Sequence, residues 1–364
     1  MVEHSLDVGR VHRFESCTAH MITLGIETSC DETALCLLQT EGNEYRVLGN
    51  LIHSQVDTHR GFGGVVPMLA KREHIKNLPI LYKKIIEESN IKESDIDRIA
   101  VTYGPGLEPA LWTGILFAKE LSEKLHKPIY PINHMEGHIV SVMIDNDFGE
   151  FKKINFPALA ILISGGHTEI VNVRELGKYE ILGSTLDDAV GEAFDKVARM
   201  LQLPYPGGPH VSELAEKARG EKIKNEIRLP RPMIHSKDLN FSFSGLKTSV
   251  LYLLKEIENI NQDQIKDLCR EFENSVTEVL IEKTKRALEK QEYRGLIVGG
   301  GVIANKYIRK SFENLTSQYS IPLYLPIPSL TGDNALMIAL AGALTTTKPS
   351  VEGLVAIGNL SLRN

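Results

Sequence analysis

The sequence has few cysteines and no long apolar run. Its four cysteines, Cys17, Cys30, Cys36 and Cys269, form no CxxC pair and no regular disulfide framework, which indicates a reducing, cytoplasmic setting. No apolar segment reaches the ~20 residues that a membrane-spanning helix needs, so we expect no membrane partner. Residues 1–20 lack the apolar centre of a signal peptide. We expect them to be a disordered or misassigned extension.

An excess of positive charge is also missing. The net charge is −6 at pH 7 and the pI is near 6.1, which excludes nucleic-acid binding driven by bulk positive charge. A local basic patch or a basic partner remains open. The GxxxxGK[ST] motif of a P-loop is absent. With 364 residues, 42% of them hydrophobic, the chain is long enough for two lobes of a globular protein.

Two histidines stand four residues apart in the segment 133–138, Asn-His-Met-Glu-Gly-His. On a helix that begins here, His134 and His138 would share one face and could bind one metal ion. Ordinary surface or capping histidines would show the same spacing, so a third ligand must come from elsewhere. In the HExxH motif of metalloproteases glutamate follows the first histidine. Here Met135 holds that position and Glu136 comes one residue later, which argues against a protease.

The order of predicted elements repeats once along the chain. Each half contains three strands, then a helix, a strand, a helix and a strand, with additional helices in the second half. The predicted strands are 22–27, 34–39, 45–53, 98–103, 128–132, 158–163, 169–173, 179–183, 296–298 and 322–325. The predicted helices are 67–88, 111–125, 187–201, 212–220, 246–258, 262–289, one from about 304, and 333–344. This duplication predicts an α/β protein with two related lobes around a cleft.

Two glycine clusters occupy matching places in this repeated pattern. Ser164-Gly165-Gly166 lies between two predicted strands, where missing Cβ atoms would let a phosphate approach the backbone. Gly299-Gly300-Gly301 lies between a strand and a helix, a position that suits a base and a ribose. Either cluster alone would be explained by a tight turn. Their matching positions favour a nucleotide site.

Ten motifs follow one another in an order that resembles a known family. They are GIETSCDET (25–33), FGGVVP (62–67), YGPGL (103–107), NHMEGH (133–138), LISGGHT (162–168), DAVGEAFDK (188–196), YPGGP (205–209), NFSFSGLKT (240–248), GGGVIAN (299–305) and TGDNA (331–335). Over residues 21–345 the chain resembles the TsaD family, relatives of the catalytic subunit of the KEOPS complex that were formerly classed as O-sialoglycoprotein endopeptidases. The resemblance implies the duplicated fold of actin, sugar kinases and heat-shock ATPases (the ASKHA fold), with a central ligand cleft.

The resemblance also implies an activity. Members of the family transfer a threonylcarbamoyl group from threonylcarbamoyl-AMP to the N6 amine of the adenosine just 3′ of the anticodon, in tRNAs that read ANN codons. By resemblance, His134, His138 and Asp333 bind one divalent metal, usually Fe2+, with Zn2+ as the alternative. The residues implied to bind the donor are Leu162, Ile163, Ser164, Gly165, Gly166, Asp195, Gly208 and Asn305. The implied partners are a paralogous non-catalytic subunit of the same fold (TsaB) and a small P-loop ATPase (TsaE).

Three positions depart from the family pattern without removing a metal ligand. Met68 follows Val-Val-Pro where glutamate is usual, Ser212 stands where a carboxylate is common, and Gly332 replaces a threonine. Because of the departures at Met68 and Ser212, the sequence does not determine the ribose contacts or the polarity of the site. Two further alternatives are a non-catalytic binding protein of the same fold and a sugar or acetate kinase. The three retained ligands argue against the former, and a kinase has no use for a histidine pair.

The lobes are expected at 21–133, together with a returning helix at about 333–346, and at 134–332, followed by a tail at 347–364. Three polar segments allow more than one interpretation. Asp31 and Glu32 would act as acid/base groups or form an Asx-turn, which we favour. Lys247 and the basic stretch 228–237 would bind ligand or simply be solvated.

Overall fold

The computed structural model describes residues 20–224, 226–257, 259–350 and 352–362. The expected extension, 1–20, lies outside them except for His20. The strands are β1 (Met21–Glu27), β2 (Glu32–Glu41), β3 (Glu44–Ser54), β4 (Arg98–Gly104), β5 (Ile129–Asn133), β6 (Phe148–Glu150), β7 (Ala158–Ile163), β8 (Thr168–Glu175), β9 (Lys178–Ser184), β10 (Leu296–Gly299) and β11 (Leu323–Tyr324). The helices are α1 (Val56–Arg60), α2 (Pro67–Ser89), α3 (Glu108–Leu125), α4 (His134–Val140), α5 (Val190–Met200), α6 (Gly207–Gly220), α7 (Ser244–Glu256), α8 (Gln262–Lys290), α9 (Lys306–Tyr319) and α10 (Ala335–Leu344).

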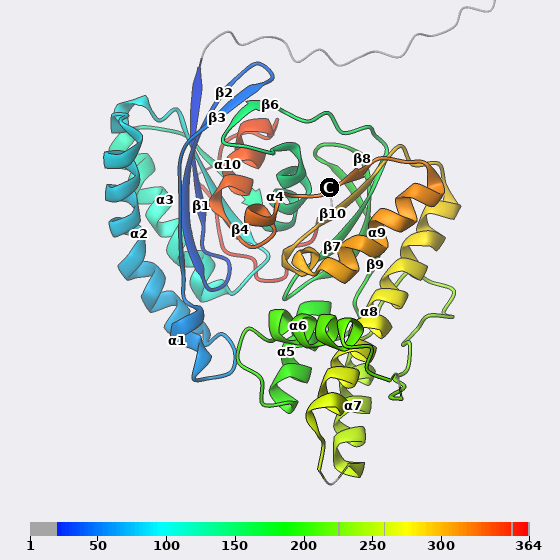
Figure 1. The fold of residues 1–364 in the computed structure, drawn as a ribbon. Helices are drawn as coiled ribbons and strands as arrows, with labels where there is room; N and C mark the ends of the chain where they lie inside the picture. Colours follow the sequence, from blue (N-terminus) through cyan, green and yellow to red (C-terminus); the bar gives the residue numbers. More distant parts are fainter. Residues whose placement is uncertain (1–19, 225, 258, 351, 363–364) are drawn as a thin grey trace, which may run out of the picture.

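The first lobe is built on a sheet with the strand order β5-β4-β1-β2-β3-β6. β1 pairs antiparallel with β2 and parallel with β4. Leu24 and Ile26 of β1 are fully buried because helices cover both faces of the sheet. α2 and α3 lie side by side on the outer face, and α10 covers the inner face (Figure 1).

The second lobe repeats this plan on a sheet with the order β11-β10-β7-β8-β9. β7 pairs antiparallel with β8 and parallel with β10, as β1 does with β2 and β4. The six apolar residues of β7 are all buried, as expected for a central strand. Apolar side chains from α5 to α9 form one core with the outer face of this sheet. The duplicated α/β pattern predicted from the sequence is therefore confirmed.

Two helices lie between the sheets and pack the two lobes together. α4 contacts β7 and β10 of the second sheet, whereas α10 contacts β1, β2 and β4 of the first, and the two helices touch each other. α10 is apolar all round (ALMIALAGAL) because sheet and helix enclose it. Gly25 of β1 makes this packing close, since a Cβ atom there would lie 2.3 Å from the carbonyl oxygen of Ala335. This approach brings the start of α10 beside the end of β1.

Several helix starts differ from the sequence predictions, and three of them lie near the site. α6 begins at Gly207 and not at Ser212, because the Asp195 carboxylate accepts a hydrogen bond from the Gly207 N–H (2.7 Å) at the helix start. α5 begins at Val190, after Asp187 and Asp188, and α10 begins at Ala335. The remaining predicted elements end within a few residues of the observed ones.

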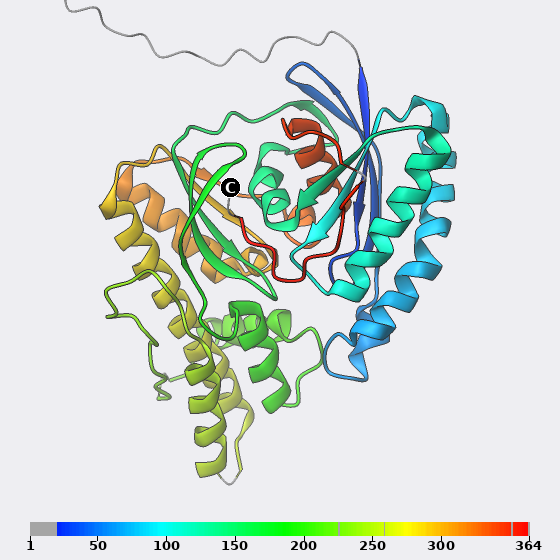
Figure 2. The ribbon, with the colours of Figure 1, turned by 180° about the vertical axis from the view of Figure 1, so that it is seen from behind.

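The last described residues return to the first lobe. Ile357 N–H donates to the Tyr103 carbonyl (2.9 Å), and Gly106 N–H donates to the Gly358 carbonyl (3.0 Å). Leu362 is buried in the core between the sheets. Figure 2 shows this segment crossing from the first sheet toward the second. In the part of the chain that the structure describes, no helix is long and apolar enough to cross a membrane.

Candidate metal centre

The histidine pair is held by a short capped helix. β5 runs directly into α4, where Asn133 Oδ1 accepts a hydrogen bond from the Met135 N–H (2.8 Å) and caps the helix. His134 and His138 then project from one face, with ring centroids 4.7 Å apart. Both rings are buried beneath the cleft. The spacing prediction for these two residues therefore describes the observed arrangement.

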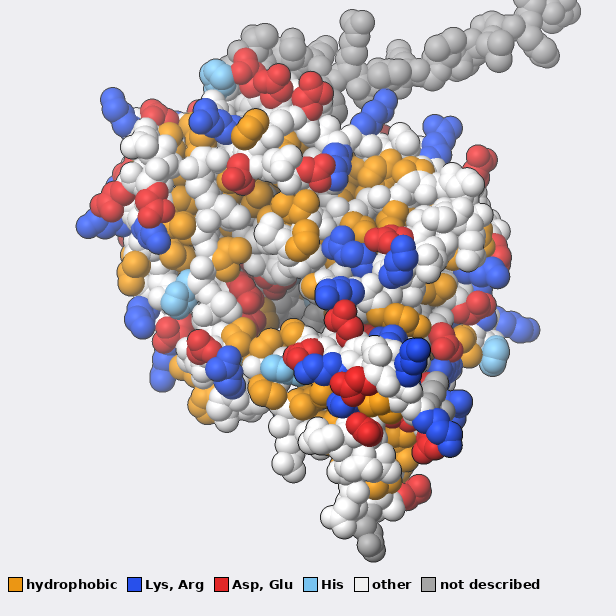
Figure 3. Space-filling view, in the orientation of Figure 1, with side chains coloured by type: hydrophobic (Ala, Val, Ile, Leu, Met, Phe, Trp, Pro, Cys, Tyr) orange, Lys and Arg blue, Asp and Glu red, His pale blue; other side chains and the backbone are white. Residues whose placement is uncertain are grey.

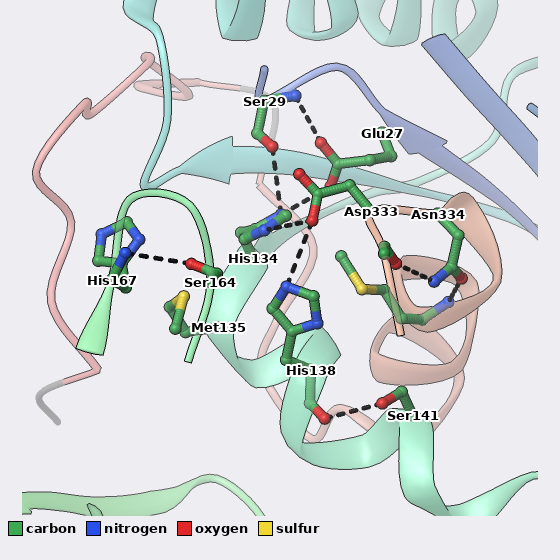
Figure 4. Close-up of polar contacts among 12 residues, drawn as sticks. Glu27, Ser29, His134, Met135, His138, Ser141, Ser164, His167, Asp333 and Asn334 are labelled. Atoms are coloured by element: carbon green, nitrogen blue, oxygen red, sulfur yellow. Dashed lines mark hydrogen bonds and ion pairs between the residues drawn. The ribbon is translucent and has the colours of Figure 1, made fainter. Parts of the chain in front are cut away.

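Asp333 completes the cluster from the other end of the chain. Its Oδ1 atom lies 3.3 Å from His134 Nε2 and 3.4 Å from His138 Nε2 (Figure 4). A plain capping role for Asp333 is wrong, because Asn334 is the cap of α10. The Asn334 side-chain oxygen accepts from the Met337 N–H (2.9 Å). The carboxylate of Asp333 is thus directed at the histidines and away from its own helix.

The three side chains fit a metal ion. Their ligand atoms all lie within 4.8 Å of one another. Tetrahedral coordination with metal–nitrogen bonds of ~2.0–2.1 Å separates ligand atoms by ~3.3–3.4 Å, close to the two distances to Asp333. Within the described residues, neither ring nitrogen of His138 has a hydrogen bond of good geometry, and Nε2 faces the Asp333 carboxylate at 3.4 Å. A buried polar atom left unpaired is costly, and a metal bond would satisfy Nε2. The cluster therefore supports a metal cofactor, with no preference for one metal.

Charges in the cluster shift the pKa values in opposite directions. Burial alone would lower the pKa of His134, but the carboxylates of Asp333 and Glu27 raise it well above its ordinary value. Burial lowers the pKa of His138. Burial would raise the pKa of Asp333, yet His134 and His138 hold it well below its usual range. Without metal, the site is therefore an ion pair between Asp333 and a protonated His134, beside a neutral His138.

Glu27 and Ser29 are neighbours of the cluster that sequence reasoning missed. Glu27 Oε2 lies 3.0 Å from His134 Nδ1 and accepts a hydrogen bond from the Thr102 hydroxyl (2.7 Å). Ser29 Oγ is 3.3 Å from the same ring nitrogen. A carboxylate that accepts from the outer nitrogen of a metal-bound histidine fixes the tautomer of that ring. The available signal was a lone glutamate at the end of a buried strand.

The glycine-rich turn after β7 lies at the mouth of the site. Leu162, Ile163 and Ser164 are buried, and Gly165 and Gly166 are exposed. A Cβ atom on either glycine would meet nothing within 4 Å, so the turn borders open space. His167 follows the turn, and its N–H donates to the Ser164 hydroxyl (3.1 Å; Figure 4). Burial, with added repulsion from His134 and His138, lowers the pKa of His167 to about 4.

Asp195 and Gly208 meet at the start of α6. Asp195 accepts from the Gly207 N–H, and burial raises its pKa. A cavity of about 120 Å3 adjoins them, lined by Arg60, Gly63, Asp195, Arg199, Leu203, Pro204, Tyr205 and Gly207. Across this cavity the Arg199 guanidinium donates to the carbonyl of Gly63, which joins the second lobe to the first. Figure 3 shows the surface hollowed between the lobes.

Asn305 lies in the second lobe, and both polar atoms of its side chain form hydrogen bonds within the protein. Its oxygen caps α9 by accepting from the Ile308 N–H (2.9 Å). Its amide nitrogen donates to the buried Glu273 carboxylate (2.5 Å) and lies 3.2 Å from Ser212 Oγ. Ser212, the unusual residue at a position where a carboxylate is common, thus contacts Asn305 directly. Glu273 supplies a carboxylate to this corner of the cleft.

The remaining candidate residues are tied to protein groups. Lys247 pairs with Asp188 (2.8 Å), and Arg231 pairs with Glu278 (2.8 Å), so neither is simply solvated. Glu136 accepts a hydrogen bond from the Tyr179 hydroxyl (2.8 Å) on β9. Asp31 is buried, and the Asx-turn expected of it stays a prediction.

Residues 46–340 match the family TsaD, described as tRNA N6-adenosine threonylcarbamoyltransferase. The chain is 43% identical over 342 residues to a protein of that name from Thermosipho melanesiensis, covering 94% of this chain and 100% of the relative. It is 45% identical over 325 residues to another from Dictyoglomus turgidum, covering 88% of this chain and 92% of the relative. The chain belongs to the TsaD family.

Solved structures agree with this TsaD fold at much lower sequence identity. Component A of (R)-2-hydroxyglutaryl-CoA dehydratase from Acidaminococcus fermentans shares it with a TM-score of 0.50 at 14% identity, covering 88% of this chain and 96% of that chain. Full-length HypF shares the fold with a TM-score of 0.53 at 13% identity, covering 90% of this chain and 46% of the HypF chain. The actin-like fold with two lobes is therefore confirmed.

Proposed function

We propose that this chain is a tRNA N6-adenosine threonylcarbamoyltransferase whose reaction centre is the His134, His138 and Asp333 cluster. The observation that carries the proposal is the convergence of these three residues at one point in a chain of the TsaD family. Bound there, a divalent metal would act as a Lewis acid on the donor's carbonyl or carboxylate oxygens. We propose Fe2+, with Zn2+ as the alternative.

The protein's own contribution is mainly orientation. The acceptor amine of adenine is a poor nucleophile, whereas the donor is a reactive mixed anhydride, so alignment should supply much of the rate. We propose that the turn Leu162–Gly166 binds the donor, with Asp195 and Gly208 at its ribose. The buried His134–Glu27 pair keeps Nε2 of His134 directed at the metal position. No residue is assigned as a general base.

Asn305 is proposed to stand beside the adenine as a positioning residue. Because Glu273 and the α9 backbone already engage its amide, the base would meet the neighbouring backbone of 300–302. Gly300 shapes this loop, since its φ of +96° suits glycine and a Cβ atom would lie 2.4 Å from the Ile163 carbonyl oxygen.

The geometry disfavours the other candidate activities. Glu136 is directed at Tyr179 of the second sheet, so it is not placed as the general base of a metalloprotease. A kinase needs a carboxylate base and Mg2+, and has no use for two buried histidines facing one carboxylate. A non-catalytic binding subunit would have no need of the three converged ligands.

The substrates and partners are proposed on family grounds. The donor is threonylcarbamoyl-AMP, and the acceptors are tRNAs that read ANN codons. We propose assembly with the paralogous non-catalytic subunit TsaB and the small ATPase TsaE, in the cytoplasm. The net charge of −6 agrees with a requirement for partners that add positive surface.

The test combines metal analysis with a transfer assay. The purified protein should hold about one metal ion per chain and modify unmodified ANN-decoding tRNA when supplied with threonylcarbamoyl-AMP and both partners. The double variant His134→Ala with His138→Ala should lose both the metal and the transfer while its circular dichroism spectrum stays native. Full metal occupancy in that variant would contradict the assignment of the ligands.

A further inference from the structure

A buried polar network in the first lobe is not used by the reaction centre. It consists of Gln55, His59 and His74, each at most 1% exposed, which come from the start of α1, its interior and α2. Buried polar side chains cost stability unless they are hydrogen-bonded, and here several meet in one place. They lie between the turn Ser29–Glu32 and the loop Gly61–Val66.

The hydrogen bonds of this network form a chain in which a donor and an acceptor can be assigned at each step. The Val66 N–H donates to His59 Nδ1 (3.3 Å), so the proton of His59 is on Nε2, which donates to Gln55 Oε1 (3.1 Å). The Gln55 amide nitrogen then faces His74 Nδ1 (3.3 Å). His74 Nε2 donates to the Cys30 carbonyl (3.0 Å). These directions place the ring proton of His59 and that of His74 on Nε2.

Two additional contacts tie the network to the turn. The Thr33 hydroxyl is 2.8 Å from His74 Nδ1, and the Gln55 N–H donates to the Asp31 carbonyl (2.9 Å). Burial lowers the pKa of His74, in agreement with a neutral ring that accepts at Nδ1. The chain thus reaches the backbone of the turn at two successive residues, Cys30 and Asp31.

The turn lies beside the metal cluster. Ser29 Oγ lies beside His134, and the Ser29 N–H donates to Glu27 (Figure 4). The charge of Asp31 adds to burial in raising the pKa of Asp195 on α5 of the second lobe. At the other end of the network, the loop 61–66 receives Arg199 from the second lobe through the Gly63 carbonyl.

We propose that His59, Gln55 and His74 are positioning residues that set the turn Ser29–Glu32 relative to the loop Gly61–Val66. The proposal rests on the proposed function of the reaction centre. Through this connection, the contact of Arg199 with Gly63 between the lobes is linked to the placement of Ser29 beside the metal cluster. None of the three network residues touches a metal ligand in the described structure.

Two substitutions of His74 separate positioning from mere packing. The amide nitrogen of His74→Gln reaches the place of Nε2 and still donates to the Cys30 carbonyl. The shorter side chain of His74→Asn places its amide near Nδ1 and loses that bond. Gln55→Met fills a similar volume without either polar group and interrupts the network at its centre. These full-length variants are compared with wild type by Tm, by transfer kinetics and by the alkylation rate of Cys30.

Cys30 reports the turn directly and without catalysis. It is partly exposed, and burial raises the pKa of its thiol well above the ordinary value, so wild-type alkylation by iodoacetamide should be slow. In His74→Asn and Gln55→Met we expect alkylation of the Cys30 peptide, followed by mass spectrometry, to rise about fivefold. We expect kcat to fall about tenfold to hundredfold, with little change in the KM for the donor.

His74→Gln should stay within about threefold of wild type in both readouts, because the bond to Cys30 is kept. Equal losses in His74→Gln and His74→Asn that follow their Tm values would overturn the proposal in favour of packing alone. Unchanged alkylation and unchanged kcat in His74→Asn and Gln55→Met would overturn it as well. If wild type failed to transfer threonylcarbamoyl, the proposed function would fall, while alkylation would still decide the role of the network.

Discussion

Glu27 accepts a hydrogen bond from Nδ1 of His134, although the two residues are 107 positions apart in the chain. Burial would raise the pKa of Glu27, but His134 lowers it, so the carboxylate stays ionised in a fully buried place. The Thr102 hydroxyl and the Ser29 N–H occupy its other lone pairs. A buried charge held by three partners orients the ring more firmly than packing alone would.

Glu27→Gln should therefore weaken metal binding without removing a ligand. The amide keeps the size of the side chain but loses the charge that supports His134, so we expect the Kd for the metal to rise about tenfold to hundredfold. Competition with a chelator of known affinity measures the change. Thr102→Val is the matched control, since it removes one support of Glu27 and should have a smaller effect. Equal metal affinity in Glu27→Gln and wild type would disprove the positioning role.

Asp333 and Asn334 are adjacent residues with separate tasks, so their substitutions should give opposite results. Asp333→Asn should reduce metal content and transfer strongly. The cap of α10 is untouched and His134 keeps Glu27 as a partner, so the metal-free protein should lose only the stability that the His134–Asp333 ion pair supplies.

Asn334→Ala removes the cap of α10 and should destabilise the protein by about 1 kcal/mol, while metal is still bound. Metal analysis, thermal melting and the transfer assay on both variants check the pair. Native transfer by Asp333→Asn would show that its carboxylate is not needed.

Binding of tRNA by the isolated protein should be weak and should fall steeply with salt. The chain carries a net charge of −6, and candidate cations such as Lys247 and Arg231 are paired with carboxylates. Adding the two partners should tighten binding and should increase the number of phosphate contacts, which steepens the salt dependence. Filter binding or fluorescence anisotropy over a range of salt concentrations measures both. Tight binding by the isolated chain at physiological salt would contradict the need for partners.

The sequence predicted the elements well where the pattern is local. The six apolar residues of β7 and the start of α2 at Pro67 were found within one residue. The spacing of His134 and His138 was sufficient to place both rings on one face. Asp333 was different, because only the resemblance connected it to the histidines. Its role depends on α10 returning to β1, a contact that no local pattern reveals.

The missed residues share one cause, which is dependence on contacts between distant segments. Glu27 reads as the polar end of a strand until α4 is packed beside it. Gln55 and His74 read as unrelated side chains of a loop and a helix. Gly207 reads as part of a turn, yet the carboxylate of Asp195 makes it the first residue of α6. Such pairings require the fold, since sequence periodicity reports only which face of an element is buried.

The stability of the metal-free protein depends on pH through the charges of His134 and Asp333. Burial opposes protonation of His134, but Asp333 and Glu27 raise its pKa well above the ordinary value. The stabilising contribution of His134 is therefore fully present below its unfolded pKa of ~6.5 and is lost as the pH rises through the folded value. The contribution of Asp333, whose folded pKa is depressed, is present above ~3.9 and is lost as the pH falls.

The last prediction is that metal binding at neutral pH releases a proton from His134. A histidine ligand must be neutral, and His134 is protonated in the metal-free site, whereas burial keeps His138 neutral already. Uptake of one metal ion should thus expel about one proton, and the metal Kd should fall about tenfold per pH unit until the pH exceeds the folded pKa of His134. Calorimetric titrations in two buffers with different ionisation enthalpies count the protons. In Glu27→Gln the pKa of His134 is lower, so fewer protons should be released, although the metal binds more weakly. A metal Kd that is independent of pH between 6 and 8 would mean that His134 is neutral before the metal arrives and that Asp333 and Glu27 do not protonate it.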